Sequence, residues 1–400
     1  MDSDRMVRAF YKSFDARHRD GENCVHDQFH PQTIDCSRQK YLAPSLIALA
    51  TVFATSARAE PIRLATFNTE LSRDGPGLLL RDILGAKDRQ VNSVIDVLNF
   101  AKADVLVLQN FDWDLELRAI KALNSQLEDP YPFIFSKRPN TGIQSGKDLN
   151  LNGKFGEPGD AFGYGEFAGQ DGMALLSRFP ILNANVIDFT TFDWRDLPGA
   201  KLDLSDEFST ESAAEIGWLR LSSTAHWVVP ISIGSRTLTI LTHHATPPVF
   251  DGPEDRNGRR NADELLFWVE FLEGELGVPP IKENLVMLSV TNLDPNDGDG
   301  LKETYKQFLD ATNFVDPKPH STGGQSEGQH DAHLGDPSLD TVDWPEDYGP
   351  GNLRVDYALP SADLTVMQTG VVWPKDDSYG LGRAVRHASR HRLVYLDIDF

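Results

Sequence analysis

The sequence predicts an α+β fold in which two packed β-sheets are flanked by helices. Short segments with the alternating or continuous apolar pattern of strands recur between residues 62 and 400. Segments with the spacing of an amphipathic helix are fewer and lie between the strands. Hydrophobic residues make up 40% of the chain and aromatic residues 10%, which suffices for a sizeable core and excludes a wholly disordered protein.

Strands are expected where such apolar patterns are bounded by turn-forming residues. Residues 63–67 alternate in polarity, and residues 104–108 form the continuous apolar run of a buried strand. Residues 226–233 and 236–242 are separated by a Gly-Ser turn and should form a hairpin. The remaining strands are predicted at 172–177, 181–189, 285–290, 353–359, 364–371 and 393–400.

Three helices are expected between these strands. Apolar residues within 91–98 recur at i, i+3, i+4 and i+7, which is the pattern of a helix with one buried face. Residues 115–127 and 264–272 have a similar pattern. The sequence has no internal repeat and no clear linker after residue 60, so we expect a single domain over residues 60–400.

Residues 1–59 are predicted to be an N-terminal extension that ends in a signal-peptide-like segment. Basic residues at 38–40, an apolar run at 42–56 and a small-x-small motif at 57–59 follow one another in the order of an export signal. The apolar run of about 15 residues is shorter than the roughly 20 that a membrane helix needs, so no stable membrane span is expected. A buried core helix is the alternative interpretation. We therefore expect a periplasmic or secreted protein, with an extension at 1–36 of unknown role.

The formal net charge of −22 argues against a protein whose main contact with nucleic acid is a basic surface. Residues 1–59 contain nearly equal numbers of basic and acidic residues, so the acidity belongs to the predicted domain. A local basic pocket or a bound cation remains compatible with that charge. Both cysteines, Cys24 and Cys36, precede the domain, which excludes a disulfide framework within it.

Polar residues recur where the predicted strands end. They are Asn68, Asn110, Asp112, His243, His244, Asn292, Asp294, Arg354, Asp356 and His391. Functional residues collect where strand ends and loops meet at the rim of a sheet. Each of these residues alone is equally a turn former, but their joint recurrence indicates a shared site.

Five segments at these positions resemble the endonuclease/exonuclease/phosphatase superfamily, which has the DNase I-like fold. They are residues 65–68, 107–110, 242–247, 292–295, and 354–357 together with 389–392, and they follow the order of the family. Residues 169–178 and 249–260 resemble an uncharacterised exported bacterial branch of it. The resemblance implies a four-layer αββα sandwich of two mainly antiparallel sheets flanked by helices. It also implies hydrolysis of a phosphoester.

The resemblance assigns roles to individual residues. His391 would be the base that activates water, and Asp356 would orient it. His244, or less well His243, would contact the phosphate. The amides of Asn68 and Asn292 would hold metal-bound water or phosphate oxygens.

Three departures from the family pattern weaken the expected metal site. Asn110 stands where the family usually has a glutamate as its main metal ligand. Val290 replaces an aspartate that positions the nucleophile, and Arg390 replaces a third carboxylate. A hard cation prefers several oxygen ligands, preferably charged. A site for Mg²⁺, Mn²⁺ or Ca²⁺ is therefore expected to be weak or absent.

Two functional hypotheses follow from these departures. In the first, Arg390 supplies fixed positive charge and the chain is a metal-independent phosphoester hydrolase. In the second, the chain is a pseudoenzyme that keeps the fold and binds a phosphorylated ligand or has a structural role. A small phosphorylated molecule is the first candidate substrate, because the net charge disfavours nucleic acid. The predicted substrate-binding residues are Arg390, His243, Asn110 and Arg354.

A calcium loop is a separate hypothesis. Asp148, Asn150 and Asn152 place oxygens at positions 1, 3 and 5 of an EF-hand-like loop, with Gly153 at position 6. The glutamate expected at position 12 is missing, and Asp160 follows one position later. A polar loop without an ion is the alternative.

Two weaker clusters complete the candidates. Residues 255–260 are cationic and would either contact an anionic substrate or begin a helix. His320, His330 and His333 lie in a Gly/Ser-rich stretch in which a His-x-x-His pair is a weak zinc signal.

Overall fold

The computed structural model describes residues 60–149, 152–202, 219–327, 331, 333–345, 349–376 and 378–400. These residues belong to one unit, Glu60–Phe400. The extension and export signal predicted within residues 1–59 lie outside the described residues. In the part of the chain that is described, no helix is long and apolar enough to cross a membrane.

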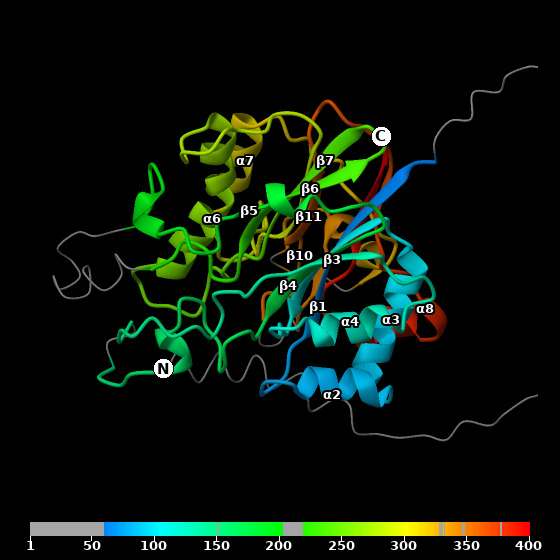
Figure 1. Ribbon diagram of the computed structural model, residues 1–400, viewed down its shortest axis with the longest axis horizontal. Coiled ribbons are helices and arrows are strands. Elements are labelled where there is room, and N and C mark those ends of the chain that lie inside the picture. Colours follow the sequence, from blue (N-terminus) through cyan, green and yellow to red (C-terminus); the bar gives the residue numbers. More distant parts are fainter. Residues whose placement is uncertain are drawn as a thin grey trace, which may run out of the picture. The chain divides into compact units, whose positions relative to one another are not determined.

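The first sheet has the strand order β12-β13-β1-β2-β4-β3 in the described structure (Figure 1). Its strands are β1 (Ile62–Leu71), β2 (Val105–Phe111), β3 (Phe133–Phe135), β4 (Gly172–Ser177), β12 (Thr365–Val371) and β13 (Val394–Asp399). Neighbouring strands are antiparallel except for β1 and β2, which are parallel. The ladder between β1 and β2 is irregular after Asn68. At that irregularity Glu70 and Asn110 both have positive φ angles, 49° and 51°.

The second sheet has the order β11-β8-β7-β6-β5. Its strands are β5 (Ile187–Asp188), β6 (His226–Ile233), β7 (Arg236–His243), β8 (Leu285–Val290) and β11 (Asp356–Pro360). The predicted hairpin is confirmed as β6 and β7. β7 and β8 are parallel, and the other neighbours are antiparallel. A short ribbon of β9 (Val342–Asp343) and β10 (Asn352–Leu353) lies apart from both sheets in the hydrogen-bond ladder.

Helices cover the outer face of each sheet. The first sheet is covered by α2 (Leu78–Gly85), α3 (Arg89–Ala101), α4 (Arg118–Asn124) and α8 (Gly380–Ala388), and the second by α6 (Arg256–Glu273) and α7 (Glu303–Ala311) (Figure 1). Short 3₁₀ turns occur at Pro158–Asp160, Asn183–Asn185, Trp194–Asp196, Gly324–Ser326 and Pro337–Leu339. The predicted sandwich of two mainly antiparallel sheets flanked by helices is therefore confirmed.

The apolar core between the sheets lies next to the candidate site. Leu64 of β1 and Trp227 of β6 are fully buried in that core. Alternate residues of a strand face the same side, so Thr66 and Asn68 follow Leu64 on the inward face of β1. Both polar residues are buried. The inward face of β1 is thus apolar along its first half and polar where the strand approaches the rim.

Two predicted helices differ in length from those observed. The helix expected at 264–272 begins at Arg256, so the cationic residues from Arg256 onward form its first turns. The helix expected at 115–127 is limited to α4, because Leu117 adopts a left-handed conformation and Ser125 ends the helix. α8 was not predicted, since two glycines and several cationic residues obscure its apolar face.

Candidate active site

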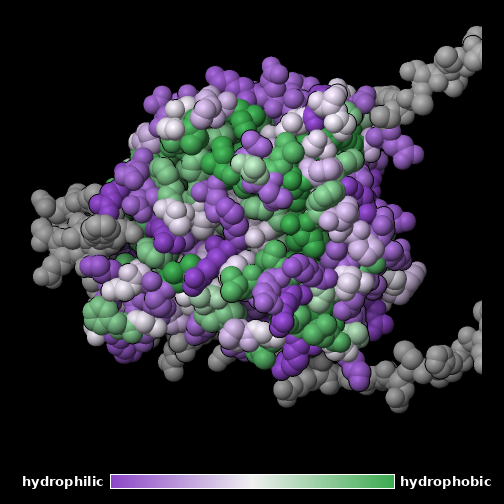
Figure 2. All heavy atoms as spheres, in the orientation of Figure 1, coloured by the Kyte–Doolittle hydropathy of each residue, from purple (hydrophilic) through white to green (hydrophobic). Residues whose placement is uncertain are grey.

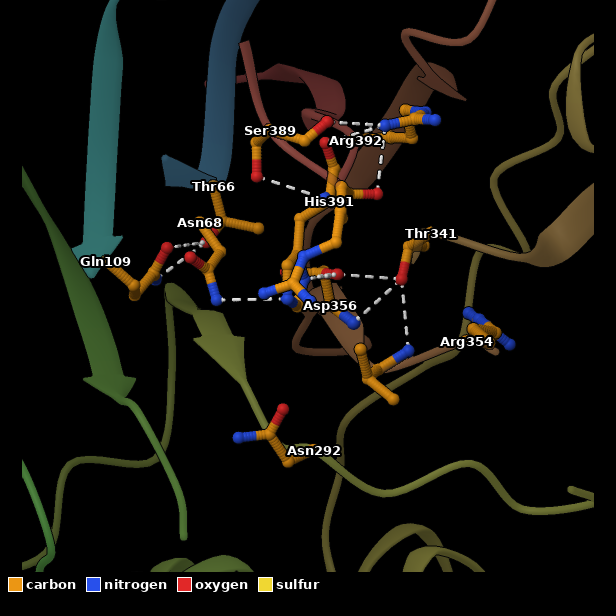
Figure 3. A network of polar contacts seen from close by, with 12 residues as sticks. Thr66, Asn68, Gln109, Asn292, Thr341, Arg354, Asp356, Ser389, His391 and Arg392 are labelled. Atoms are coloured by element: carbon orange, nitrogen blue, oxygen red, sulfur yellow. Dashed lines mark hydrogen bonds and ion pairs between the residues drawn. The ribbon is translucent and has the colours of Figure 1, made fainter. Parts of the chain in front are cut away.

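His391 and Asp356 form a buried hydrogen-bonded pair (Figure 3). Asp356 begins β11, and His391 lies three residues before β13. The Nδ1 atom of His391 lies 2.8 Å from Oδ2 of Asp356 and 3.1 Å from Oδ1. The His391 side chain is 4% exposed, and Asp356 is 0% exposed. The two residues come from different sheets, so the pair joins the two halves of the sandwich at the rim.

Asn68 fixes the proton arrangement on the His391 ring. Its Nδ2 atom lies 3.2 Å from Nε2 of His391, while its Oδ1 atom accepts a hydrogen bond from the backbone N–H of Glu70. An amide nitrogen can only donate, so Nε2 must be the acceptor. Nδ1 then carries the proton and donates it to Asp356. The lone pair of Nε2 faces away from Asp356 as a potential base.

Thr341 supports Asp356 from the segment before β9. Its hydroxyl donates to Oδ2 of Asp356 over 2.8 Å and accepts the backbone N–H groups of residues 355 and 356, each over 3.0 Å. Its carbonyl accepts the N–H of Arg392 over 2.7 Å. The ring of Trp344 meets the His391 ring edge-on, with centroids 5.6 Å apart. Thr341 was not among the site residues predicted from the sequence. The only available signal was the short run Thr341–Val342–Asp343, which has the alternation of a strand within a loop-like stretch.

His244 and Asn292 approach the same rim from the second sheet. His244 follows β7 and forms a bridge with Val290 at the end of β8. Burial, and then the nearby charge of His391, lowers the pKa of His244 to about 3, so its ring is neutral. The Nδ2 atom of Asn292 donates to the carbonyl of Ala245 over 2.7 Å. Figure 3 shows Asn292 beside the His391 network but without a hydrogen bond to it.

His243 lies on the opposite face of β7 from His244, as alternation along a strand requires. Its ring stacks on His226 with centroids 4.7 Å apart, and its Nδ1 accepts a hydrogen bond from Trp268 over 3.0 Å. Burial, and then the neighbouring histidines, lowers its pKa well below the usual value. Of the two predicted histidines, His244 is thus the one on the inner side of the sheet, and His243 packs against α6.

The side chain of Arg354 also points away from His391 (Figure 3). Its guanidinium forms two hydrogen bonds with Asp316, of 2.8 and 2.6 Å. It also lies over the ring of Tyr357. The predicted substrate-binding role of Arg354 therefore has no geometric support, because its donors are directed at the carboxylate of Asp316.

Arg390 is paired with Glu70, a residue that sequence reasoning missed. The Nε atom of Arg390 donates to Oε1 of Glu70 over 2.7 Å, and Nη2 donates to the same oxygen. Oε2 accepts the backbone N–H of Arg390 over 2.8 Å and the hydroxyl of Ser389 over 3.1 Å. Burial alone would raise the pKa of Glu70, but the charge of Arg390 outweighs it and lowers the pKa to about 2. The positive charge of Arg390 is therefore balanced within the chain.

Two further carboxylates lie close together near the end of β2. Oδ1 of Asp112 accepts the hydroxyl of Ser72 over 3.0 Å and the backbone N–H of Asp171 over 3.2 Å. Burial, and then the charge of Asp171, raises the pKa of Asp112 to about 7. Burial raises the pKa of Asp171 to about 6. Oδ1 of Asp171 and Oδ1 of Asn110 are buried without a hydrogen-bond partner among the described residues.

The oxygen atoms beside His391 are not suited to bind a divalent cation. Both oxygens of Glu70 accept hydrogen bonds from Ser389 and Arg390, and Oδ2 of Asp356 is shared between His391 and Thr341. Within the described ranges, no group of three or more His, Cys, Asp or Glu residues is arranged to hold a metal ion. Hard cations need several available oxygen ligands.

The predicted calcium loop uses its carboxylates internally. The Asp148 oxygens accept the backbone N–H groups of residues 152 and 153, over 3.1 and 2.7 Å. The Asp160 oxygens also accept backbone N–H groups of the same loop. Asn150 lies outside the described residues. The described part has the geometry of a polar loop that is held by its own amides.

The remaining clusters have structural partners. His333 lies between two carboxylates, with Nδ1 3.2 Å from Asp297 and Nε2 3.0 Å from Asp340. His330 lies outside the described residues, so the zinc hypothesis has no test there. Arg260 of the cationic segment donates to three backbone carbonyls. That contact ties α6 to the loops beside it.

The sandwich with a histidine and an aspartate at its rim is the architecture of a class of phosphoester hydrolases. The sequence matches the profile of the Endonuclease/Exonuclease/phosphatase family over residues 65–278, more than half of the chain. The chain therefore belongs to this family, whose members are phosphoester hydrolases with the DNase I-like fold. No curated protein matches the sequence.

Several solved structures resemble the chain. An endonuclease/exonuclease/phosphatase from Beutenbergia cavernae is 14% identical with a TM-score of 0.49, and the match covers 85% of this chain and 71% of that one. The mannosyl-6-phosphatase of Bacteroides thetaiotaomicron is 14% identical with a TM-score of 0.45, covering 85% and 100%. A mutant of beta toxin from Staphylococcus aureus with bound magnesium ions is 13% identical with a TM-score of 0.44, covering 84% and 99%.

Proposed function

We propose that this chain is a phosphoester hydrolase that activates water with His391 and Asp356 and does not depend on a divalent metal. The observation that carries the proposal is the continuous hydrogen-bonded line from Thr341 through Asp356 to His391. It holds the ring in the Nδ1–H tautomer, and the lone pair of Nε2, to which Asn68 donates, can take a proton once that amide turns to a phosphate oxygen. A general base needs this combination of position and protonation state.

In the proposed reaction, Nε2 of His391 takes a proton from a water molecule as that water attacks phosphorus. The P–O bond opposite the attacking water breaks, and the leaving alkoxide is then protonated by solvent. Asp356 stabilises the imidazolium that forms, because its carboxylate already faces Nδ1. Asn68 and the neutral ring of His244 supply donors for the phosphate oxygens, on which negative charge accumulates in the transition state.

The pairing with Glu70 changes the role expected for Arg390. A guanidinium that is shared with a carboxylate adds no net positive charge to the pocket. In this proposal the ion pair holds the Ser389–Arg390–His391 segment against β1, and thereby holds the base in place. Stabilisation of the phosphate then rests on neutral donors, so we expect a slow enzyme.

The alternative function is a pseudoenzyme that binds a phosphorylated ligand. One observation favours it specifically. Val290, where the family has an aspartate, is 0% exposed and belongs to the hydrogen-bonded ladder beside Asp356 and His244. An aliphatic side chain there can neither orient water nor bind a cation.

A metal-controlled assay separates the two candidates. The full chain would be incubated with p-nitrophenyl phosphate, bis-p-nitrophenyl phosphate or plasmid DNA, in Mg²⁺, Mn²⁺, Ca²⁺ or EDTA. We expect turnover that persists in EDTA, disappears in His391→Ala and survives in the matched control His320→Ala, a histidine that bonds Ser338. Turnover that depends on added metal contradicts the metal-independent mechanism, and no turnover in any condition favours the pseudoenzyme.

Export to the periplasm or the medium is a further part of the proposal. It is supported by the order of basic, apolar and small residues between 38 and 59, directly before the described unit begins at Glu60. Expression of the full chain in a bacterium, followed by fractionation and N-terminal sequencing, tests it. We expect the exported form to begin near residue 60, and retention of an uncleaved chain in the cytoplasm would contradict it.

A further inference from the structure

Two polar residues of α6 lie against the rim of the second sheet. Asn261 and Glu264 are three positions apart, so they share one face of the helix. Both residues are 0% exposed. A fully buried carboxylate or amide is costly unless it is hydrogen-bonded. The hydrogen bonds of these two side chains go to loops that leave the sheet at one edge.

Asn261 joins the segments that follow β7 and β8. The two strands are parallel neighbours, so residues 244–246 and 291–292 leave the sheet at the same edge. The Nδ2 atom of Asn261 donates to the carbonyls of Thr246 and Thr291, each over 2.7 Å. An amide N–H₂ group has two hydrogens, so each carbonyl can receive one. A single side chain thereby fixes how the two segments lie relative to each other.

Glu264 holds the first of these segments at a second point. Its Oε2 atom accepts the backbone N–H of Thr246 over 2.5 Å. Its Oε1 atom accepts the backbone N–H and the hydroxyl of Ser223, over 2.7 and 3.0 Å. Ser223 precedes β6, which is antiparallel to β7, so it lies at the same edge of the sheet. Burial raises the pKa of Glu264 to about 6, and the charge of Arg260 is the largest effect that opposes the rise. The carboxylate is therefore ionised at pH 8.

The first segment contains His244, which lies two positions before Thr246. The Nδ1 atom of the His244 ring is buried and has no hydrogen-bond partner among the described residues, so no bond at that atom holds the ring. From the second segment, the amide of Asn292 donates to the carbonyl of Ala245. The position of the ring therefore depends on the backbone of residues 244–246, which α6 and Asn292 hold.

We infer that Asn261 and Glu264 are positioning residues that place the His244 ring for contact with a phosphate oxygen. The inference rests on the proposed function, in which this ring is a donor. A neutral donor stabilises transition-state charge only from a fixed position, and a displacement of about 1 Å can lower a rate by about 10²-fold. Stability alone does not account for Asn261, because its Oδ1 atom is buried without a partner among the described residues, which lowers stability.

The test is a double-mutant cycle in the full chain, with bis-p-nitrophenyl phosphate at pH 8. Asn261→Ala should lower kcat/KM by about tenfold or more. In the His244→Ala background the same substitution should change kcat/KM by less than about twofold, since the residue through which it acts is gone.

Asp263 of the same helix supplies the matched control. It is 1% exposed and accepts hydrogen bonds from the Trp194 ring and from the backbone N–H of Lys201, outside the segments that follow β7 and β8. Asp263→Ala should therefore lower the melting temperature, as Asn261→Ala does, but should change kcat/KM by less than about twofold.

Two outcomes overturn the inference and leave the proposed function standing. One is an equal loss of kcat/KM in Asn261→Ala and Asp263→Ala, and the other is an undiminished effect of Asn261→Ala in the His244→Ala background. If Asn261→Ala does not fold, Glu264→Gln takes its place in the cycle. That variant keeps the shape of the side chain and an acceptor for one partner, but it cannot accept from both Ser223 and Thr246.

A second measurement applies if the unmodified chain hydrolyses no ester, so that the proposed function fails. Binding of inorganic phosphate is then measured by calorimetry in the same variants. Phosphate binding that is weakened about tenfold or more by Asn261→Ala, but not by Asp263→Ala, supports the positioning role without hydrolysis. Equal binding by the two variants, or no phosphate binding by the unmodified chain, overturns the inference.

Discussion

The two nitrogens of the His391 ring have partners of opposite kind, and this difference determines what the ring can do. Asp356 accepts from Nδ1, and Asn68 donates to Nε2. A histidine held between an acceptor and a donor is restricted to one neutral tautomer. Loss of either partner would release that restriction without removing the ring. The catalytic proposal can therefore be tested at the neighbours of His391 as well as at the residue itself.

The first prediction concerns Asp356. In Asp356→Asn the amide can present its N–H₂ group to Nδ1, which would favour the tautomer with its proton on Nε2. We expect kcat for bis-p-nitrophenyl phosphate to fall by about 10²-fold or more, the contribution typical of a general base, with little change in KM. Steady-state kinetics measure both parameters. An unchanged kcat in a variant that melts at the temperature of the unmodified chain would contradict the proposed mechanism.

The second prediction concerns Thr341, which acts through Asp356. Thr341→Val keeps the shape of the side chain but removes its hydroxyl, so Asp356 loses one donor. Asp356 is then held less firmly against Nδ1 of His391, so kcat for bis-p-nitrophenyl phosphate should fall while KM changes little. Thr341→Ser, which keeps the hydroxyl, should restore kcat. An unchanged kcat in Thr341→Val, or a loss that Thr341→Ser does not restore, would contradict the positioning role.

The third prediction concerns the neighbouring carboxylates of Asp112 and Asp171. The pKa of Asp171 is raised to about 6, so the stability linked to its protonated form is present below pH 4 and is lost as the pH rises through 6. Asn suits the positive φ angle of 51° at this position and carries no charge. Asp171→Asn should therefore stabilise the protein by about 2–3 kcal/mol at pH 8 and leave its stability nearly unchanged at pH 4.

Urea denaturation at the two pH values measures this difference. The exposed residue Asp310 supplies the control, since Asp310→Asn should show no such gain at pH 8. Equal effects of Asp171→Asn at pH 4 and pH 8 would show that ionisation of Asp171 does not lower the stability of the fold.

At the level of elements, the Glu70–Arg390 ion pair connects β1 to the segment between α8 and β13. Glu70 lies in the irregularity where β1 and β2 depart from regular pairing. That irregularity turns the side chain toward Arg390 and away from the regular ladder. The irregular pairing of β1 thereby helps to position the segment that contains His391, directly before β13.

The fourth prediction tests this connection. Glu70→Gln leaves the largely buried guanidinium of Arg390 without its counter-ion and should destabilise the protein by about 3 kcal/mol at pH 7. The pKa of Glu70 is lowered to about 2, so its stabilising effect is present above pH 4.5 and is lost as the pH falls toward 2. The variant and the unmodified chain should therefore converge in stability near pH 2.

The double variant Glu70→Gln, Arg390→Met is the matched control for the fourth prediction. It removes both charges, so most of the lost stability at pH 7 should return. Chemical denaturation of the single and double variants measures the coupling. If the double variant is as unstable as the single one, the ion pair is not the reason for the effect.

The sequence predicted the parts of the site that depend on strand ends. The four residues Asn68, His244, Asp356 and His391 lie within or beside strands whose apolar patterns are strong, so their positions at a rim could be inferred. Glu70 could not be inferred, because its direction depends on an irregular pairing that has no sequence periodicity. Thr341 was missed for a similar reason, since it belongs to a loop segment that the second sheet and the residues near His391 hold in place.

The sequence did not reveal the partners of two cationic residues that had been assigned to substrate binding. The positive charge of Arg390 was visible, but its pairing with a glutamate 320 positions earlier was not. Arg354 was likewise expected near substrate and instead faces Asp316. Charge neutralisation inside a fold depends on contacts between distant segments. Composition and motif spacing contain little information about such contacts.

At the level of the whole molecule, the two sheets share one apolar interior. Trp227 of the second sheet meets Phe135 of the first, with ring centroids 5.0 Å apart at an angle of 84°. Figure 2 shows hydrophilic residues interspersed with apolar ones over the face in view. The interior between the sheets is lined by the apolar residues of this shared core.

The fifth prediction follows from this shared interior. Trp227→Ala removes a fully buried side chain between the sheets and should cost about 3–5 kcal/mol. Because both sheets lose contacts, they should unfold in one transition, so that far-UV circular dichroism and hydrogen exchange report the same midpoint. Tyr379→Ala, at an exposed aromatic residue, should change the stability little. Two separate transitions in the Trp227 variant would show that the sheets are independent.

The position of β13 has a consequence for how the protein is made. β13 pairs with β1 on one side and β12 on the other, and Ile398 lies opposite Ile62. A ribosome that adds about 5–20 residues per second needs on the order of 20–70 seconds to pass from one of these strands to the other. During that interval β1 has β2 beside it but an open opposite edge, and His391 does not yet exist. The edge of β1 that β13 covers in the fold therefore stays without its partner strand until residues 394–399 have been synthesised.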